Sequence, residues 1–136
     1  KSKPLPVFVA NIPMAWELAE INTRQAKVLR RYWPGKYTFV LQRKSGEKLH
    51  GIDKSTIALR IPKHVFLQKL LKKINRPLVQ TSVNISSQET LKNVDDILAV
   101  FGKNKLVGCI VKGGGVRSAK PSKILDLTSN KPKKVR

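Results

Sequence analysis

Acidic residues are scarce in this chain of 136 residues, which carries 8 Asp and Glu against 28 Lys and Arg. The resulting formal charge of +20 attracts polyanions whatever the fold, so nucleic acids, nucleotides and anionic surfaces are all candidate partners. The lysines are spread along the chain instead of forming one basic tail, so part of the excess also solvates the surface. Charge alone therefore selects no single partner.

Cysteine and long apolar runs are almost absent as well. Cys109 is the only cysteine, which excludes an internal disulfide, and its apolar neighbours in LVGCIV predict a buried, unreactive thiol. No apolar run approaches the ~20 residues of a membrane helix, and the start of the sequence has no signal-peptide pattern. We therefore expect a cytoplasmic protein without a membrane partner.

Standard catalytic and metal-binding signatures are also missing. His50 and His64 have no cysteine or carboxylate cluster around them, which argues against a metal site. The glycine-rich segment KGGGVRSAKPS lacks the GK[ST] ending of a Walker A loop, so its glycines favour an ordinary loop. No residue is identified as a catalytic group by pattern alone.

Strand and helix patterns alternate along the chain, which favours an α/β or α+β fold with ligands where strand ends meet loops. The length predicts a single domain over residues 1–136. Apolar and β-branched runs predict strands at residues 4–10, 37–42, 56–61, 77–79, 106–111 and 124–127. Periodic apolar residues behind capping residues predict helices at 12–21, 23–32, 64–75 and 94–101.

The helix predicted at 64–75 has a basic outer face formed by Lys69, Lys72 and Lys73. Its apolar residues recur at three- and four-residue spacing, which predicts that they face the core: Phe66, Leu67, Leu70, Leu71 and Ile74. The three lysines are the candidate contacts for RNA, which they would bind weakly and without sequence preference.

The segment PLVQTSVNISS, residues 77–87, begins as a short apolar strand, which we expect to lie buried inside the sheet. Small hydrogen-bonding side chains follow at its end: Thr81, Ser82, Asn84, Ser86 and Ser87. Such residues bond to their own backbone in turns, so the cluster indicates either a turn or a ligand site at the open end of the strand.

Arg60 lies in the otherwise apolar strand TIALRI. A buried or half-buried arginine requires an anionic partner or several acceptors. Because acidic residues are scarce, a bound anion is the simplest candidate, and we expect Ser82 to lie near Arg60.

Four segments in order, YWPGKYTFVL, STIALRIPKH, PLVQTSVNISS and PSKILDLT, resemble the motifs of the YrdC-like family, the threonylcarbamoyl-AMP synthases. The resemblance covers nearly the whole chain and implies an α/β fold, a twisted mixed sheet flanked by helices, of a type associated with double-stranded RNA. It also implies an enzyme that joins L-threonine, bicarbonate and ATP into threonylcarbamoyl-AMP and pyrophosphate.

The product of such an enzyme feeds the t6A modification of tRNA, which makes the downstream t6A transfer proteins and tRNA implied partners. Mg²⁺ is the implied counter-ion of the phosphates. The resemblance assigns L-threonine to Arg60, Gln80 and Ser122. It assigns ATP to Lys3, Thr56, Ser82, Asn84, Thr90 and Arg136.

The match departs from the family pattern in several places. A PTDTxYGL-like strand and a Lys-x-Arg motif would precede Lys1, so we expect a domain without its N-terminal strand and helix segment and without its C-terminal end. Ser87 replaces the usual glycine, Lys36 a common proline, and Phe8 a histidine of some members. Two alternatives remain: a double-stranded RNA or tRNA-binding module without full activity, and the YrdC-like module of a hydrogenase-maturation carbamoyltransferase.

Overall fold

The computed structural model describes residues 5–46, 49–113, 121–129 and 132–135 of the chain. The chain divides into two compact units. The first, called here the sheet unit, contains Lys1–Thr81 and Pro121–Arg136, and the second unit contains Ser82–Lys120. The expectation of one domain that lacks terminal segments stays a prediction.

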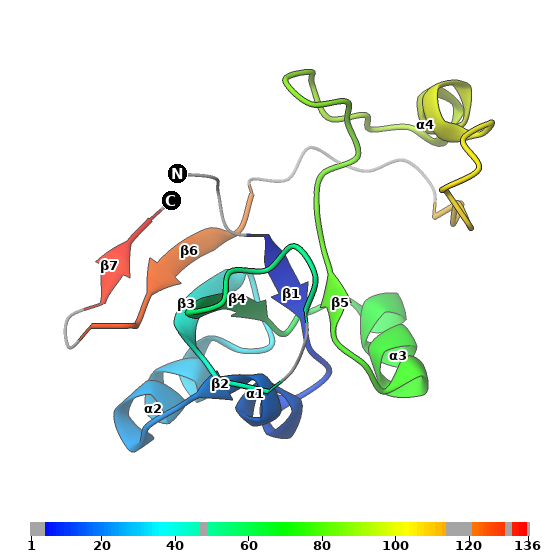
Figure 1. Cartoon of the computed structure of the whole chain (residues 1–136). Coiled ribbons are helices and arrows are strands. Elements are labelled where there is room, and N and C mark those ends of the chain that lie inside the picture. Colours follow the sequence, from blue (N-terminus) through cyan, green and yellow to red (C-terminus); the bar gives the residue numbers. More distant parts are fainter. Residues whose placement is uncertain (1–4, 47–48, 114–120, 130–131, 136) are drawn as a thin grey trace. The chain divides into compact units, whose positions relative to one another are not determined.

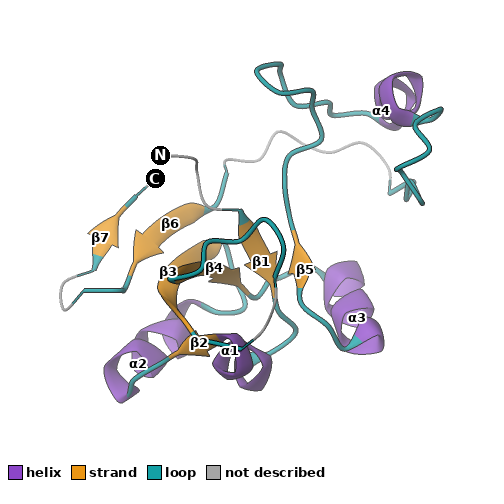
Figure 2. Cartoon of the chain, viewed as in Figure 1, coloured by secondary structure: helices purple, strands orange, loops and turns teal. Residues whose placement is uncertain are grey.

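Helices and strands alternate along most of the chain (Figures 1 and 2). The helices are α1 (Ile12–Leu18), α2 (Thr23–Tyr32), α3 (Val65–Ile74) and α4 (Val94–Phe101). The strands are β1 (Pro6–Phe8), β2 (Ala19–Glu20), β3 (Tyr37–Arg43), β4 (Thr56–Arg60), β5 (Leu78–Val79), β6 (Lys123–Asp126) and β7 (Lys133–Lys134). Of these elements of the described residues, α4 alone belongs to the second unit.

The sheet has the order β5-β1-β4-β3-β6-β7, and β2 pairs with β3 beside this path. β1 runs parallel to β4 and β3 parallel to β6, whereas β3 and β4 are antiparallel. The sheet is therefore mixed, and α1, α2 and α3 pack against it through the main core. This arrangement confirms the predicted α/β class with a mixed sheet and flanking helices.

Local capping signals explain where the helices begin. The Asn11 side chain accepts a hydrogen bond from the Met14 backbone N–H at 2.9 Å and so caps α1. At α2, Asn22 and Gln25 form a capping box, because each side chain accepts from the backbone N–H of the other. The Asn93 side chain caps α4 by accepting a hydrogen bond from the Asp96 backbone N–H at 2.8 Å.

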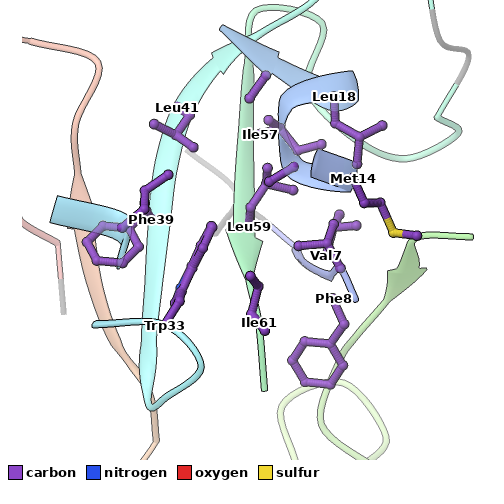
Figure 3. Close-up of a cluster of buried hydrophobic side chains, with 14 of the residues drawn as sticks. Val7, Phe8, Met14, Leu18, Trp33, Phe39, Leu41, Ile57, Leu59 and Ile61 are labelled. Atoms are coloured by element: carbon purple, nitrogen blue, oxygen red, sulfur yellow. The ribbon is translucent and has the colours of Figure 1, made fainter. Parts of the chain in front are cut away.

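The main core joins buried residues of α1, α2 and α3 to one face of the sheet, and Figure 3 shows part of this cluster. Phe39 and Leu41 of β3 pair with Leu59 and Ile57 of β4, so all four side chains point to this face. Trp33 packs edge-on against Phe39, with ring centroids 5.4 Å apart. Each fully buried aliphatic side chain contributes about 1.5–3 kcal/mol to folding, so these pairs anchor β3 and β4 at the centre of the sheet.

The opposite face is called here the even face, because it carries the even-numbered residues of the central strands. Val40, Ala58 and Ile124 form a small buried cluster there, to which no described helix residue belongs. Strand alternation places Thr38 and Arg60 on the same side as this cluster. The even face therefore carries the polar residues Thr38 and Arg60 beside a small buried apolar cluster.

Two predictions were wrong: that the strand at 77–79 lies inside the sheet, and that residues 106–111 form a strand. β5 lies at the end of the sheet order and not inside the sheet, and its Leu78 and Val79 are 37% and 46% exposed. A three-residue apolar run cannot show whether a second neighbour will cover it. Residues 106–111 form no strand, because the described part of the second unit offers no other strand to pair with. Cys109, expected to be buried, is consequently exposed.

The inward face of α3 is narrower than its periodicity predicted. Leu71 is fully buried and Leu67 packs against the core, but Phe66 and Ile74 are 47% and 38% exposed. These two residues flank the stripe that Leu67 and Leu71 form at i, i+4 spacing, so they lie at its margins. α1 also ends earlier than expected, at Leu18, because the chain turns there into the short β2.

Candidate functional site

Arg60 ends β4 on the even face and is half-buried. Its Nε donates a hydrogen bond to the Gly35 carbonyl at 2.9 Å, and its guanidinium carbon lies 5.6 Å from the centre of the Phe8 ring. Burial lowers the pKa of Arg60 below its ordinary value, and no described carboxylate pairs with it. The Gly35 carbonyl uses one of the five N–H donors of the Arg60 guanidinium. The remaining N–H groups form a planar fork that can hold a carboxylate.

Gly35 fixes the loop that holds Arg60. Its N–H donates to the Ile61 carbonyl at 2.9 Å while its own carbonyl accepts from Arg60. A Cβ at this position would lie 2.4 Å from the Tyr32 carbonyl oxygen, so only glycine fits. From the sequence, Gly35 was named only as part of the motif YWPGKYTFVL and was assigned no role, although a glycine just before a predicted strand was the available signal.

Ser122 lies just before β6 and meets Thr38 of β3 across 84 positions of sequence. The Thr38 hydroxyl donates to the Ser122 oxygen at 3.2 Å, and Thr38 is fully buried while Ser122 is half-buried. Thr38 was not among the predicted site residues, although a threonine in the apolar run YTFVL is the kind of buried polar group that requires a partner.

Gln80 follows β5, and its backbone N–H donates to the Pro6 carbonyl at 2.8 Å. Since Leu78 pairs with Phe8 on the even side of β1, Gln80 shares this face two residues further on. β5 and β6 lie on opposite sides of β4, each two strands away, which corresponds to about 10 Å from β4 at ordinary strand spacing. The three residues predicted to bind threonine, Arg60, Gln80 and Ser122, are therefore brought to one face of one sheet.

Thr56 lies at the other end of β4, about 13 Å from Arg60 at the usual rise per residue. Its backbone N–H and hydroxyl both donate to Asp53 Oδ1, at 2.9 and 3.3 Å, as do those of Ser55. The Ser55 hydroxyl is the largest of the causes that lower the pKa of Asp53 from 3.8 to about 2. Asp53 thus holds the start of β4 as an ionised carboxylate.

The second unit contains the remaining described residues of the predicted ATP site. The Ser82 hydroxyl donates to the Asn84 side-chain oxygen, and Asn84 Nδ2 donates to the Ile85 and Gln88 carbonyls at 2.8 and 3.2 Å. Ser87 has a φ of 69°, a conformation that glycine adopts without strain. These bonds are those of a turn, so the turn interpretation holds for the local geometry, and a role in ATP binding stays a prediction.

The other candidate residues fall into two groups. Lys3 and Arg136 lie outside the described residues. Thr90 is exposed in the second unit, and the lysines of α3, Lys69, Lys72 and Lys73, are all exposed. The proximity of Ser82 to Arg60 stays a prediction, because the two units are described separately.

The described residues contain no group of three His, Cys, Asp or Glu side chains that could hold a metal ion. No helix among the same residues has the length and apolarity needed to span a bilayer.

Comparison with known proteins finds relatives along the whole chain. The family model Sua5_yciO_yrdC, described as telomere recombination, matches residues 1–136. A threonylcarbamoyl-AMP synthase of Pyrococcus abyssi is 31% identical over 134 residues, which make up 95% of this chain and 38% of that protein. The chain therefore spans well under half the length of this relative.

Solved structures agree with the fold. Pyrococcus abyssi Sua5 in complex with L-threonine has a TM-score of 0.80 and 28% identity, covering 98% of this chain and 39% of its own. Escherichia coli YciO, at 23% identity, has a TM-score of 0.83 and covers 98% of this chain and 65% of its own, and it supports the fold alone. From the match of the family model over all 136 residues, the chain belongs to the Sua5/YciO/YrdC family.

Proposed function

We propose that the chain is part of a threonylcarbamoyl-AMP synthase and holds L-threonine on the even face of its sheet. The observation that carries the proposal is the half-buried Arg60, whose guanidinium faces no described carboxylate in a chain of net charge +20. The 31% identity to a synthase of that name and the threonine complex of a 28% identical structure support the same ligand. The identity favours a synthase over a hydrogenase-maturation carbamoyltransferase.

In this proposal the Arg60 fork holds the threonine carboxylate by two parallel hydrogen bonds, while Gln80 and Ser122 line the same pocket. The free amine captures carbon dioxide from bicarbonate as a carbamate. A carbamate oxygen then attacks the α-phosphate of ATP, and pyrophosphate leaves. The reaction needs positioning and charge neutralisation more than a protein nucleophile, which agrees with the lack of a recognisable triad.

ATP would be held by Thr56, Ser82, Asn84 and Thr90, together with Lys3 and Arg136. The hydroxyls and backbone N–H groups of such a set can bind phosphates without a Walker loop. The described residues offer no carboxylate cage for Mg²⁺, so we treat magnesium as arriving with the ATP phosphates, as part of the substrate. The product would pass to t6A transfer proteins in the cytoplasm.

The test is Arg60→Ala and Arg60→Lys in the whole protein, with L-threonine and ATP titrated separately by calorimetry. Loss of one charge-assisted contact costs about 2–3 kcal/mol, or roughly 30- to 150-fold in threonine affinity. Lysine should rescue poorly, because a point charge cannot reproduce the bidentate fork, and ATP affinity should change far less. Normal threonine binding by a folded Arg60→Ala variant would refute the assignment and leave Arg60 as a clamp on the Gly35 carbonyl.

A second candidate function is RNA binding through α3. Lys69, Lys72 and Lys73 are exposed on this helix, which contains no acidic residue. Such a face binds phosphate backbones without reading sequence. This activity is compatible with the synthase and would bring the protein to its tRNA pathway.

A further inference from the structure

Thr38 is the only fully buried polar side chain among the described residues of the core. Its hydroxyl has one partner among them, the Ser122 oxygen at 3.2 Å. No buried side-chain nitrogen or oxygen in the described part of the chain lacks a hydrogen-bond partner. The direction of this single bond therefore decides what Ser122 can offer to a ligand.

The burial of the two residues sets that direction. Leaving a donor unsatisfied inside the protein costs about 1–3 kcal/mol, and the Thr38 proton has no other described acceptor. Ser122 is half-buried, so its own proton can reach solvent or a ligand instead. Thr38 is thus the donor and Ser122 the acceptor of the shared bond, which leaves the Ser122 hydroxyl as a donor directed away from Thr38.

The backbone around this pair is held by the sheet. Thr38 pairs with Ile124 in the parallel β3 and β6 ladder, and the Lys123 N–H donates to the Lys36 carbonyl at 3.1 Å. Thr38 precedes Phe39, which pairs with Leu59, so the antiparallel register sets Thr38 opposite Arg60 on the even face. One residue is therefore next to both the cation and the hydroxyl of the proposed threonine pocket.

We propose that Thr38 is a positioning residue that fixes Ser122 as a hydrogen-bond donor to L-threonine, an inference that rests on the proposed function. The free Ser122 proton can then be donated to an acceptor of the ligand, such as the carboxylate or hydroxyl oxygen of the amino acid. Thr38 itself would not touch the ligand, because its side chain is fully buried and its hydroxyl is bonded to Ser122.

The experiment compares Thr38→Val, which keeps the volume and removes the hydroxyl, with Thr38→Ser, which keeps the hydroxyl. Calorimetry of L-threonine with the whole protein should show affinity lower by about three- to tenfold for Thr38→Val, the range of one neutral hydrogen bond. Thr38→Ser should remain within about twofold of the wild type. Thr128→Val is the matched control, because it removes a hydroxyl bonded to Asp126 at 2.6 Å and should leave threonine affinity unchanged.

A double-variant cycle separates positioning from general destabilisation. If Thr38 acts through Ser122, Thr38→Val should have no further effect on threonine affinity in a Ser122→Ala background. An undiminished effect in that background, or wild-type affinity of a folded Thr38→Val variant, overturns the inference while leaving the proposed function standing. Absence of threonine binding by the wild type would overturn both.

Discussion

Replacing Gly35 by alanine should both destabilise the sheet unit and weaken threonine binding. A Cβ at Gly35 would lie 2.4 Å from the Tyr32 carbonyl oxygen, a distance at which the backbone must move. Movement would break the bond from the Gly35 N–H to the Ile61 carbonyl and the bond from Arg60 Nε to the Gly35 carbonyl, both 2.9 Å. At about 0.5–1.5 kcal/mol for the first bond and about 1.5–3 kcal/mol for the second, the expected loss of stability is about 2–4.5 kcal/mol.

The assay is urea unfolding of the whole protein followed by tryptophan fluorescence, since the buried Trp33 is two residues away. Gly108→Ala is the control, because a Cβ there meets nothing within 4 Å, and it should change stability by less than about 0.5 kcal/mol. The fraction of Gly35→Ala protein that stays folded should bind threonine more weakly than the wild type does, because Arg60 has lost the carbonyl acceptor that orients it. An unfolding midpoint equal to that of the wild type would refute the reasoning that only glycine fits this loop.

Two further predictions concern charge. Asp53 has a pKa of about 2, below its ordinary 3.8, so its carboxylate stabilises the fold above pH 3.8 and this contribution is lost as the pH falls toward 2. Unfolding of Asp53→Asn should therefore depend less on pH in this window, and identical pH profiles would contradict the role of Asp53. For RNA, affinity should fall with salt by about 0.9 log unit per log unit for each duplex phosphate neutralised. Replacing Lys69, Lys72 and Lys73 by Gln should lower this slope more than replacing Lys92, Lys103 and Lys105, and equal slopes would reject α3 as the binding face.

Local signals in the sequence were sufficient for most elements of the sheet unit. The bounds of α2 were predicted correctly from its periodicity, because a capping box and an apolar stripe are set by residues three or four positions apart. β3, β4 and β6 were likewise recognisable from their β-branched and aromatic content. Arg60 was identified as a candidate ligand because a cation in an apolar strand is conspicuous without any structure.

The sequence by itself determined the α/β class, where the helices begin, and that Arg60 is a cation in an apolar strand, since each of these depends on neighbours along the chain. Tertiary structure decided what depends on distant partners. β5 is an exposed edge because only β1 pairs with it among the described strands, and residues 106–111 form no strand despite their apolar run. The bond between Thr38 and Ser122 joins residues 84 positions apart and follows from the register of β3 and β6. That register is set by packing across the whole sheet, which no local pattern records.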